Sequence, residues 1–432
     1  MATERGPTAA ARALWSGLDA AAAPAATLVL TAGLVRVFNA NDYGVMVIAL
    51  AVSGLLAAVN PAITATTTRF VSESRGQASG NDGRASQVVT ASLIAVMVVN
   101  GLLVLATAFF LDPLVRFVFG AAAVSYAGSA LLMAVLAIGI QQIDAVLAAA
   151  IRGCERFRRQ ALLEAGIRLA LAVGVLLVAW MTSDVVSALA AQCAVCAASV
   201  VIRAVALRGV IPGGRILVLP GSAAMRSILR FGSWMWLSAI AGVTYGSADR
   251  IIVGRVFGAA AAGRFNIDVQ IAQLVHYIPS SLFAFCLPAF SRLSARGGEG
   301  RAQIADAYRK YLGVIAGTAL CLAVLIVVFR RQLLQVVGGA AFDPGHEPTL
   351  ILLTVGFLVL SFNIAAYYLL LALGRSKSVS LIMTASMLAA LGLTILLIPR
   401  YGTEGAAAAR LVFAVAVLSL IGVASRRLDG SH

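Results

Sequence analysis

The stretch TASLIAVMVVNGLLVLATAFFL, residues 90–111, decides the fold class because it contains no charged side chain. A helix this apolar and this long crosses a hydrocarbon core about 30 Å thick. Two further stretches, YLGVIAGTALCLAVLIVVF (311–329) and AARLVFAVAVLSLIGVAS (408–425), are of the same kind. Of the 432 residues, 61% are hydrophobic and 12% are charged, whereas soluble proteins average roughly 45–50% and about 25%. The chain is therefore predicted to be an all-α integral membrane protein.

Apolar runs along the rest of the chain predict about 12 transmembrane helices. The spans are expected near residues 13–36, 44–70, 86–111, 121–150, 160–181, 184–207, 228–254, 263–290, 308–330, 348–373, 376–399 and 404–425. The first run begins like a signal peptide, with basic residues before an Ala-rich stretch. Trp15 and Asp19 interrupt its apolar part, which a cleaved signal does not tolerate. It is interpreted as an uncleaved first span.

The net charge of +15 is explained by its placement along the chain. If the N-terminus is cytoplasmic, most Lys and Arg residues fall on that side, including RGCERFRR (152–159) and the connectors 208–227 and 291–307. This asymmetry is the positive-inside rule of membrane proteins. We expect a multi-pass protein of the cytoplasmic (inner) membrane with both termini in the cytoplasm. Nucleic acid is not needed as a partner to explain the charge.

Catalytic and metal-binding motifs are not found. The three histidines, His276, His346 and His432, are too scattered for a metal site, and there is no Walker A loop. The sequence CAVC (193–196) lies in an apolar helical run and is interpreted as packing residues rather than a redox or metal pair. The chain is predicted to bind no metal or cofactor and not to be an enzyme.

A short phrase occurs twice: RVFNANDYG from Arg36 to Gly44, and RVFGAAAAG from Arg255 to Gly263, 219 residues later. At the same offset, residues 15–44 match residues 234–263 at nine positions without a gap. Since each half then holds six spans, the halves enter the membrane in the same sense, as in parallel transporter repeats. We predict two six-helix bundles, 1–215 and 216–432, around a central cavity. The glycine of each phrase is expected at a tight outward turn, and the arginine at the lipid headgroups, anchoring the chain in preference to contacting a substrate.

Ionisable residues inside spans are costly and usually face the bundle interior or a cavity. They are Asp19, Asp144, Glu164, Arg168, Asp249, Arg250, Asp268 and Arg410. Glu164 and Arg168 are spaced as an intrahelical ion pair; alternatively, Arg168 points into the cavity. Asp144 either pairs with Arg168 from the neighbouring span or lines the cavity itself.

Two spans carry polar stripes at helical period. In the seventh, Trp234, Ser238, Tyr245 and Asp249 share a face that ends at Arg250; in the eighth, Asn266, Gln270, Gln273 and Tyr277 share one, with His276 on its flank. Unsatisfied polar groups are expensive against lipid. The stripes therefore indicate either a hydrated lumen or hydrogen bonds between helices.

The chain resembles the polysaccharide (O-antigen-type) flippases of the multidrug/oligosaccharidyl-lipid/polysaccharide exporter superfamily over almost its full length. Four places carry the resemblance: residues 41–73 with their Tyr-Gly and closing Arg-Phe; RGCERFRRQALLEAG (152–166); residues 229–267 with Asp249-Arg250; and LIPRYGTEGAAAARL (397–411). The two extra spans common in lipid II flippases are missing.

The resemblance implies two helical halves arranged as a V, open either inward or outward. It implies alternating-access flipping of a polyprenyl-diphosphate-linked oligosaccharide for surface polysaccharide such as lipopolysaccharide. Arg168 and Arg250 are then the cationic candidates for substrate binding, beside Asp19, Asp144, Asp249, Asn266, Gln270 and Gln273. Partners would be the lipid-linked oligosaccharide, membrane lipids, a possible coupling cation, and a glycosyltransferase or polymerase of the same pathway.

Two other functions stay open at this point. One is an ion-coupled exporter of organic cations that uses the carboxylates Asp19, Asp144 and Asp249. The other is a membrane enzyme of polysaccharide assembly that does not transport.

Overall fold

Helices make up the chain wherever the computed structural model describes it. The described residues are 26–56, 58, 60–76, 83–120, 124–211, 216, 218–219, 222–283, 286, 289–290, 293, 298–339 and 347–429, and they contain no strand. Seven of the described helices are long and apolar enough to cross a membrane. Their outer faces carry large exposed apolar side chains, such as Leu105, Phe109, Leu169 and Trp180. Such a surface is stable only against lipid, so the predicted class of all-α membrane protein is confirmed.

The first helices of the chain form what we call the N-terminal group. It consists of a helix at Ala26–Val37, followed by α2 (Ala40–Leu56), α3 (Asn60–Gly76), α4 (Arg84–Phe109), α5 (Leu111–Phe119), α6 (Ala127–Gly153), α7 (Phe157–Thr182) and α8 (Val185–Arg208).

The remaining helices form the C-terminal group. They are α9 (Ser222–Phe257), α10 (Ala259–Ala272), α11 (Leu274–Leu282), α13 (Gly298–Val328), α14 (Arg330–Gly338), α15 (Glu347–Ser361), α16 (Ile364–Ala372), α17 (Ser376–Val417) and α18 (Ser419–Asp429).

Helix ends recur in the two groups at the spacing of the repeated phrase. The starts of α2 and α10, the ends of α4 and α13, and both ends of α5 and α14 each differ by 219 residue numbers, as in Ala259 against Ala40. The short helices α5 and α14 are both capped by glycines of positive φ, Gly120 (73°) and Gly339 (52°). These shared features extend the sequence repeat to backbone geometry. The division into bundles 1–215 and 216–432 stays a prediction.

Several predicted spans are interrupted. The spans expected at 44–70, 263–290 and 348–373 correspond to the helix pairs α2–α3, α10–α11 and α15–α16. The last two predicted spans lie in α17 and α18, where the backbone leaves helical geometry at Gly402 (φ 61°, ψ −141°). Only glycine adopts such angles without strain. Apolar periodicity finds spans but not the breaks inside them.

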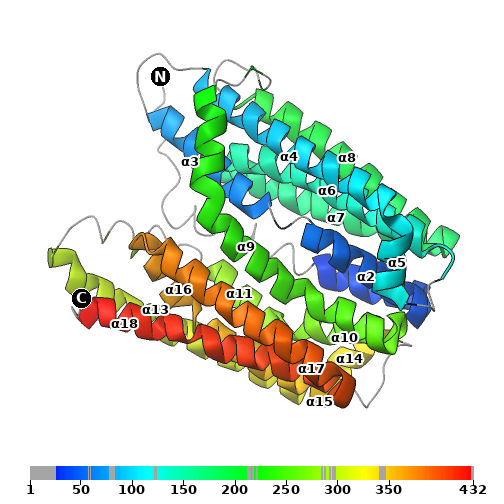
Figure 1. Cartoon of the computed structure of the whole chain (residues 1–432). Coiled ribbons are helices and arrows are strands. Elements are labelled where there is room, and N and C mark those ends of the chain that lie inside the picture. Colours follow the sequence, from blue (N-terminus) through cyan, green and yellow to red (C-terminus); the bar gives the residue numbers. More distant parts are fainter. Residues whose placement is uncertain are drawn as a thin grey trace.

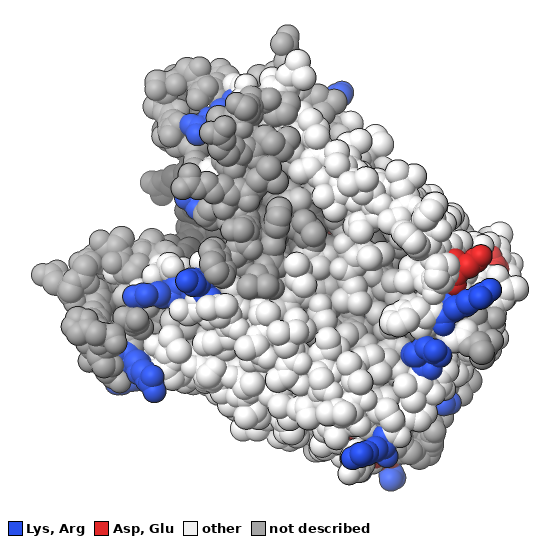
Figure 2. Space-filling view, viewed as in Figure 1, with Lys and Arg blue, Asp and Glu red and all other residues white. Residues whose placement is uncertain are grey.

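The two groups meet at one end of the molecule and separate toward the other (Figure 1). At the closed end lie α5, the start of α10, α14 and the bend of α17; at the open end lie the starts of α9 and α13 and the end of α18. The long helix α9 runs obliquely between the groups and packs against both α2 and α17. Figure 2 shows that the described surface between the two ends of the molecule is almost free of charged side chains, as expected where it faces lipid.

The repeated glycines serve a different purpose from the one expected. Gly44 and Gly263 lie inside α2 and α10, not in turns. A Cβ on Gly44 would lie 1.8 Å from the carbonyl oxygen of Ala259, and one on Gly263 would lie 3.2 Å from the Cα of Gly44. The prediction of a tight turn is wrong: the glycines let α2 and α10 touch backbone to backbone, as small residues do between membrane helices.

Candidate functional site

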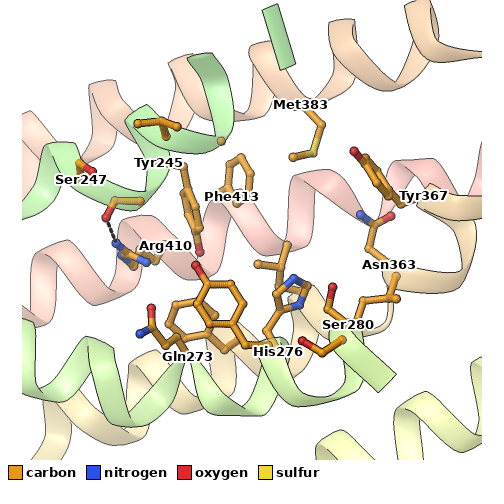
Figure 3. A pocket seen from close by; sticks show the side chains of 18 of the residues that line it. Tyr245, Ser247, Gln273, His276, Ser280, Asn363, Tyr367, Met383, Arg410 and Phe413 are labelled. Atoms are coloured by element: carbon orange, nitrogen blue, oxygen red, sulfur yellow. Dashed lines mark hydrogen bonds between the residues drawn. The ribbon is translucent and has the colours of Figure 1, made fainter. Parts of the chain in front are cut away.

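A cavity of about 840 Å³ opens within the C-terminal group. Its walls come from α9, α10, α11, α15, α16 and α17, and Thr27 of the first described helix also reaches it. Figure 3 shows polar and aromatic side chains converging on it from several helices. The volume falls in the range of roughly 300–1,000 Å³ typical of small-molecule sites. A cavity among membrane helices that is lined by polar as well as apolar side chains indicates a binding site.

Arg410 of α17 forms one wall of the cavity and is only 5% exposed. Its guanidinium makes an ion pair with Asp249 of α9, which is buried too, and donates to the Gly246 carbonyl at 3.4 Å (Figure 3). It also lies 4.7 Å from the centroid of the Tyr245 ring. That ring stacks on Phe413, with centroids 3.8 Å apart. The aromatic packing holds the buried ion pair in place.

Arg250 follows Asp249 on α9 and supplies the cavity with a second cation. Its backbone N–H donates to the Asp249 carboxylate at 2.8 Å, but its Nε has no hydrogen-bond partner among the described residues. The described lining residues include no carboxylate. Asp249 pairs with Arg410, and no ion pair of the Arg250 side chain is found in the described part of the chain.

Only part of the polar stripe predicted on the eighth span lies in the wall of the cavity. Gln270 of α10 and Gln273, between α10 and α11, line the cavity, with His276 and Tyr277 of α11 beyond them. The two glutamine amides hydrogen-bond to each other. Asn266 instead donates to the Tyr43 hydroxyl of α2 at 2.8 Å. Both proposed uses of the stripe therefore occur: most of it faces the lumen, and Asn266 bonds helix to helix. On the seventh span, the side chains of Trp234 and Ser238 lie outside the described residues.

The far end of the cavity is uncharged and was missed from the sequence. Figure 3 shows Asn363, Tyr367 and Ser280 here, away from Arg410. The Nδ1 atom of His276 and the Oδ1 atom of Asn363 are buried without hydrogen-bond partners in the described part of the chain. Buried polar atoms are normally satisfied. Two unsatisfied atoms in one cavity wall indicate groups that a polar ligand would engage.

A second polar cluster connects α6, α7 and α8 of the N-terminal group. Arg203 of α8, fully buried, donates to Asp144 of α6 (2.9 Å) and to Gln160 of α7 (2.7 Å), and it pairs with Glu164. Glu164 also pairs with Arg168 at 2.8 Å, so that predicted intrahelical ion pair is confirmed. The alternative pairing of Asp144 with Arg168 is wrong.

The reason for that error is the position of Arg203. The sequence predicted a span at 184–207 but did not single out Arg203 in it, whereas α8 (Val185–Arg208) buries this side chain completely in the protein interior. Asp144 and Arg168 are absent from the described lining of the cavity. Of the predicted site residues, the structure thus brings together Arg250, Gln270 and Gln273, with Asp249 behind the wall. Asp19 lies outside the described residues.

The comparisons with known proteins agree with this architecture. A family model described as "Polysaccharide biosynthesis protein" matches residues 20–294, more than half of the chain. A "Putative O-antigen transporter" of Shigella flexneri is 24% identical over 179 residues, which is 41% of this chain and 41% of that relative. The match therefore spans less than half of the relative's length.

Solved structures show the same fold. An inward-facing multidrug resistance MATE family transporter of the MOP superfamily superposes with a TM-score of 0.77 at 15% identity, covering 94% of both chains. An outward-facing MATE structure (15% identity) and a MOP superfamily transporter from Pyrococcus furiosus (16%) each give 0.67, covering 96% of this chain and 94% of theirs. With the family match over residues 20–294, these likenesses confirm the family resemblance of the sequence: the chain belongs to the polysaccharide biosynthesis protein family and has the fold of the MOP superfamily transporters.

Proposed function

We propose that the chain is a flippase that moves a polyprenyl-diphosphate-linked oligosaccharide across the cytoplasmic membrane by alternating access, for surface polysaccharide. Family membership supports the pathway, and the transporter fold supports the mechanism. The observation that carries the proposal is the cavity itself: among its described lining residues are two arginines and no carboxylate, and the Nε of Arg250 has no hydrogen-bond partner in the described part of the chain. An anionic headgroup is the ligand that such a site binds best.

The charges argue against an exporter of organic cations. That function needs free carboxylates, but Asp249 is held by Arg410 and Asp144 by Arg203. Each of these pairs is buried, and removing an arginine from a buried pair is unfavourable by several kcal/mol. The third carboxylate proposed for this role, Asp19, lies outside the described residues. A positively charged substrate entering the described cavity would meet Arg250 without a compensating acid.

The division of the cavity into two ends suits a diphosphate-linked sugar. Guanidinium groups bind phosphate oxygens by charge-assisted hydrogen bonds, which assigns the diphosphate to Arg250. The unsatisfied atoms of His276 and Asn363, with Ser280 and Tyr367 nearby, offer neutral donors, acceptors and an aromatic ring to sugar hydroxyls. We assign the sugar nearest the diphosphate to this end and leave the lipid tail in the bilayer.

The orientation of the V gives the direction of loading. The groups separate at the end where α9 and α13 begin (Figure 1), and the connectors there are the basic ones that the positive-inside rule places in the cytoplasm. In this arrangement the protein is inward-open and accepts substrate made in the cytoplasm. Membrane lipids, enzymes that build or polymerise the glycan, and a possible coupling cation are its expected partners.

The test is reconstitution in liposomes with a fluorescent lipid-linked oligosaccharide, followed by chemical quenching of headgroups in the outer leaflet. The wild-type protein should equilibrate headgroups between leaflets, and Arg250→Gln should slow this at least tenfold. His276→Ala and Asn363→Ala should slow transport of the glycosylated lipid more than that of polyprenyl diphosphate without sugar. Thr384→Ala, which removes a hydroxyl of α17 outside the cavity lining, is the matched control.

Folded wild-type protein that moves no headgroup would contradict the proposal. Binding of organic cations that depends on Asp249 would favour the multidrug exporter instead. Chemical conversion of the lipid-linked sugar without translocation would identify a membrane enzyme.

A further inference from the structure

The arginines of the repeated phrase reach across the molecule at its closed end. Arg36 Nη2 donates to the carbonyl of Val336 in the last turn of α14, at 2.5 Å. Its Cγ lies 3.5 Å from where a Cβ on Gly339 would be. Arg255 Nη1 lies 2.5 Å from where a Cβ on Gly120, the cap of α5, would be. Each arginine thus contacts the C-terminus of the short helix in the other group.

The two contacts are related by the repeat. Arg255 follows Arg36 by the same 219 residues that separate Gly339 from Gly120. Each arginine comes from the helix that precedes the outward turn of its own group, and each target is the nine-residue helix of the opposite group. The repeat therefore relates the two arginines to each other and their two targets to each other. We interpret the two approaches as one arrangement that occurs twice about a pseudo-two-fold axis.

The chemistry of the contact is that of a cation at a helix C-terminus. The last carbonyls of a helix lack intrahelical partners, and the aligned peptide dipoles give that end a partial negative charge. Glycine caps leave the ends of α5 and α14 without a side chain where the arginines approach. A guanidinium there supplies charge and, for Arg36, a hydrogen bond to the carbonyl of Val336.

The contacts lie beside the place where the two groups touch most closely. Gly44 of α2 packs against the backbone of Ala259 at the start of α10, and Asn266, about two turns further along α10, donates to the hydroxyl of Tyr43. The helix α2 starts three residues after the helix that carries Arg36 ends, and α10 starts four residues after Arg255. Separation of the groups at this end would break both arginine contacts.

We propose that Arg36 and Arg255 form a paired latch that holds the outward face closed and is released when the protein opens outward. This proposal depends on the proposed function in one respect: alternating-access transport requires the outward face to open. Both arginines are exposed, and a charge–dipole contact at the surface shifts an equilibrium by about 2- to 5-fold. A gate that opens in every cycle requires contacts of this modest strength.

The test is a distance measurement between spin labels on α5 and α14, at Phe117→Cys and Gln332→Cys, in protein whose five native cysteines have been replaced. Both positions are exposed. Arg36→Gln or Arg255→Gln should raise the ratio of long to short distances about 2- to 5-fold, and the double variant roughly tenfold. Arg36→Lys with Arg255→Lys keeps the charges and should stay within twofold of wild type.

Arg116→Gln is the matched control, because it removes an exposed arginine of α5 whose side chain has no hydrogen bond or ion pair among the described residues. If both arginines only anchor the chain at lipid headgroups, their glutamine variants will match Arg116→Gln, and the latch is wrong. The readout also separates the latch from the proposed function, since Arg250→Gln should slow transport at least tenfold but leave the distances between the spin labels unchanged. Monodisperse elution of each variant shows that it is folded.

Discussion

At the scale of single residues, the two arginines of the cavity wall differ in their interaction partners. Arg410 is bound to a buried carboxylate, whereas Arg250 has an unsatisfied Nε. Removing one partner of a buried ion pair leaves an uncompensated charge and costs about 3–5 kcal/mol. Structural and ligand-binding roles are therefore separable by stability measurements.

We predict that Arg410→Gln lowers the free energy of unfolding by about 3–5 kcal/mol, because Asp249 is left charged and unpaired. Combining it with Asp249→Asn should recover most of the loss, since two neutral amides replace the pair. Arg250→Gln should cost much less than Arg410→Gln, because no ion pair of the Arg250 side chain is found among the described residues and its removal therefore leaves no buried carboxylate unpaired. Denaturation in detergent measures all three. A double variant no more stable than Arg410→Gln alone would refute the pairing argument.

The cluster around Arg203 gives a second prediction of this kind. Arg203→Met removes a fully buried cation from between Asp144 and Glu164, and we expect a loss of about 3–5 kcal/mol. The control is Arg168→Gln, whose side chain is 30% exposed and pairs only along its own helix; such a pair contributes about 0.3–0.5 kcal/mol. Equal losses in the two variants would contradict the network.

At the scale of helices, the contact between α2 and α10 is the tightest that the glycines reveal. Gly44→Ala would place a methyl group 1.8 Å from a backbone oxygen, so the helices must move apart, at a cost of about 1–3 kcal/mol. Gly317→Ala in α13, where a Cβ would meet nothing within 4 Å, should instead stabilise its helix by up to about 1 kcal/mol. Thermal unfolding should show these opposite signs; a neutral Gly44→Ala would contradict the backbone contact.

Helix composition predicted much of the fold, and the reasons for the exceptions are physical. Apolar length located the spans because lipid imposes it, but breaks such as the one at Gly402 depend on backbone angles that hydrophobicity does not encode. The ion pair of Glu164 with Arg168 was predictable because its spacing is local. The partners of Asp144 and Asp249 lie 59 and 161 residues away, and a single sequence does not supply such distances.

Only part of the cavity could be predicted, because a single sequence shows which residues share a face of one helix but not which helices meet around a cavity. A helical stripe reveals the face of one helix, so Gln270 and Gln273 were identified. Asn363 lies between α15 and α16 as a single polar residue without a stripe, and His276 was placed only on the flank of one. Arg410 was noted as an ionisable residue inside a span but was not selected, since nothing local distinguishes a paired arginine from a ligand-binding one.

At the scale of the whole molecule, the proposed orientation follows from charge. We predict that Phe117→Cys on α5 reacts with a membrane-impermeant maleimide in intact cells, whereas Lys377→Cys, in the first turn of α17, reacts only after permeabilisation. Both variants are made without the native cysteines, and both positions are exposed. The opposite pattern would invert the topology and with it the direction of loading.

The duplication also has a consequence for genetics. Because the same contact is made twice, at Arg36 and at Arg255, loss of one copy leaves the other to hold the face. A scan of single substitutions would then score each arginine as nearly tolerant, although the pair is not. The deleterious combinations should lie at positions separated by the repeat length, so that epistasis between such positions, rather than the effect of either one, records how the two halves work together.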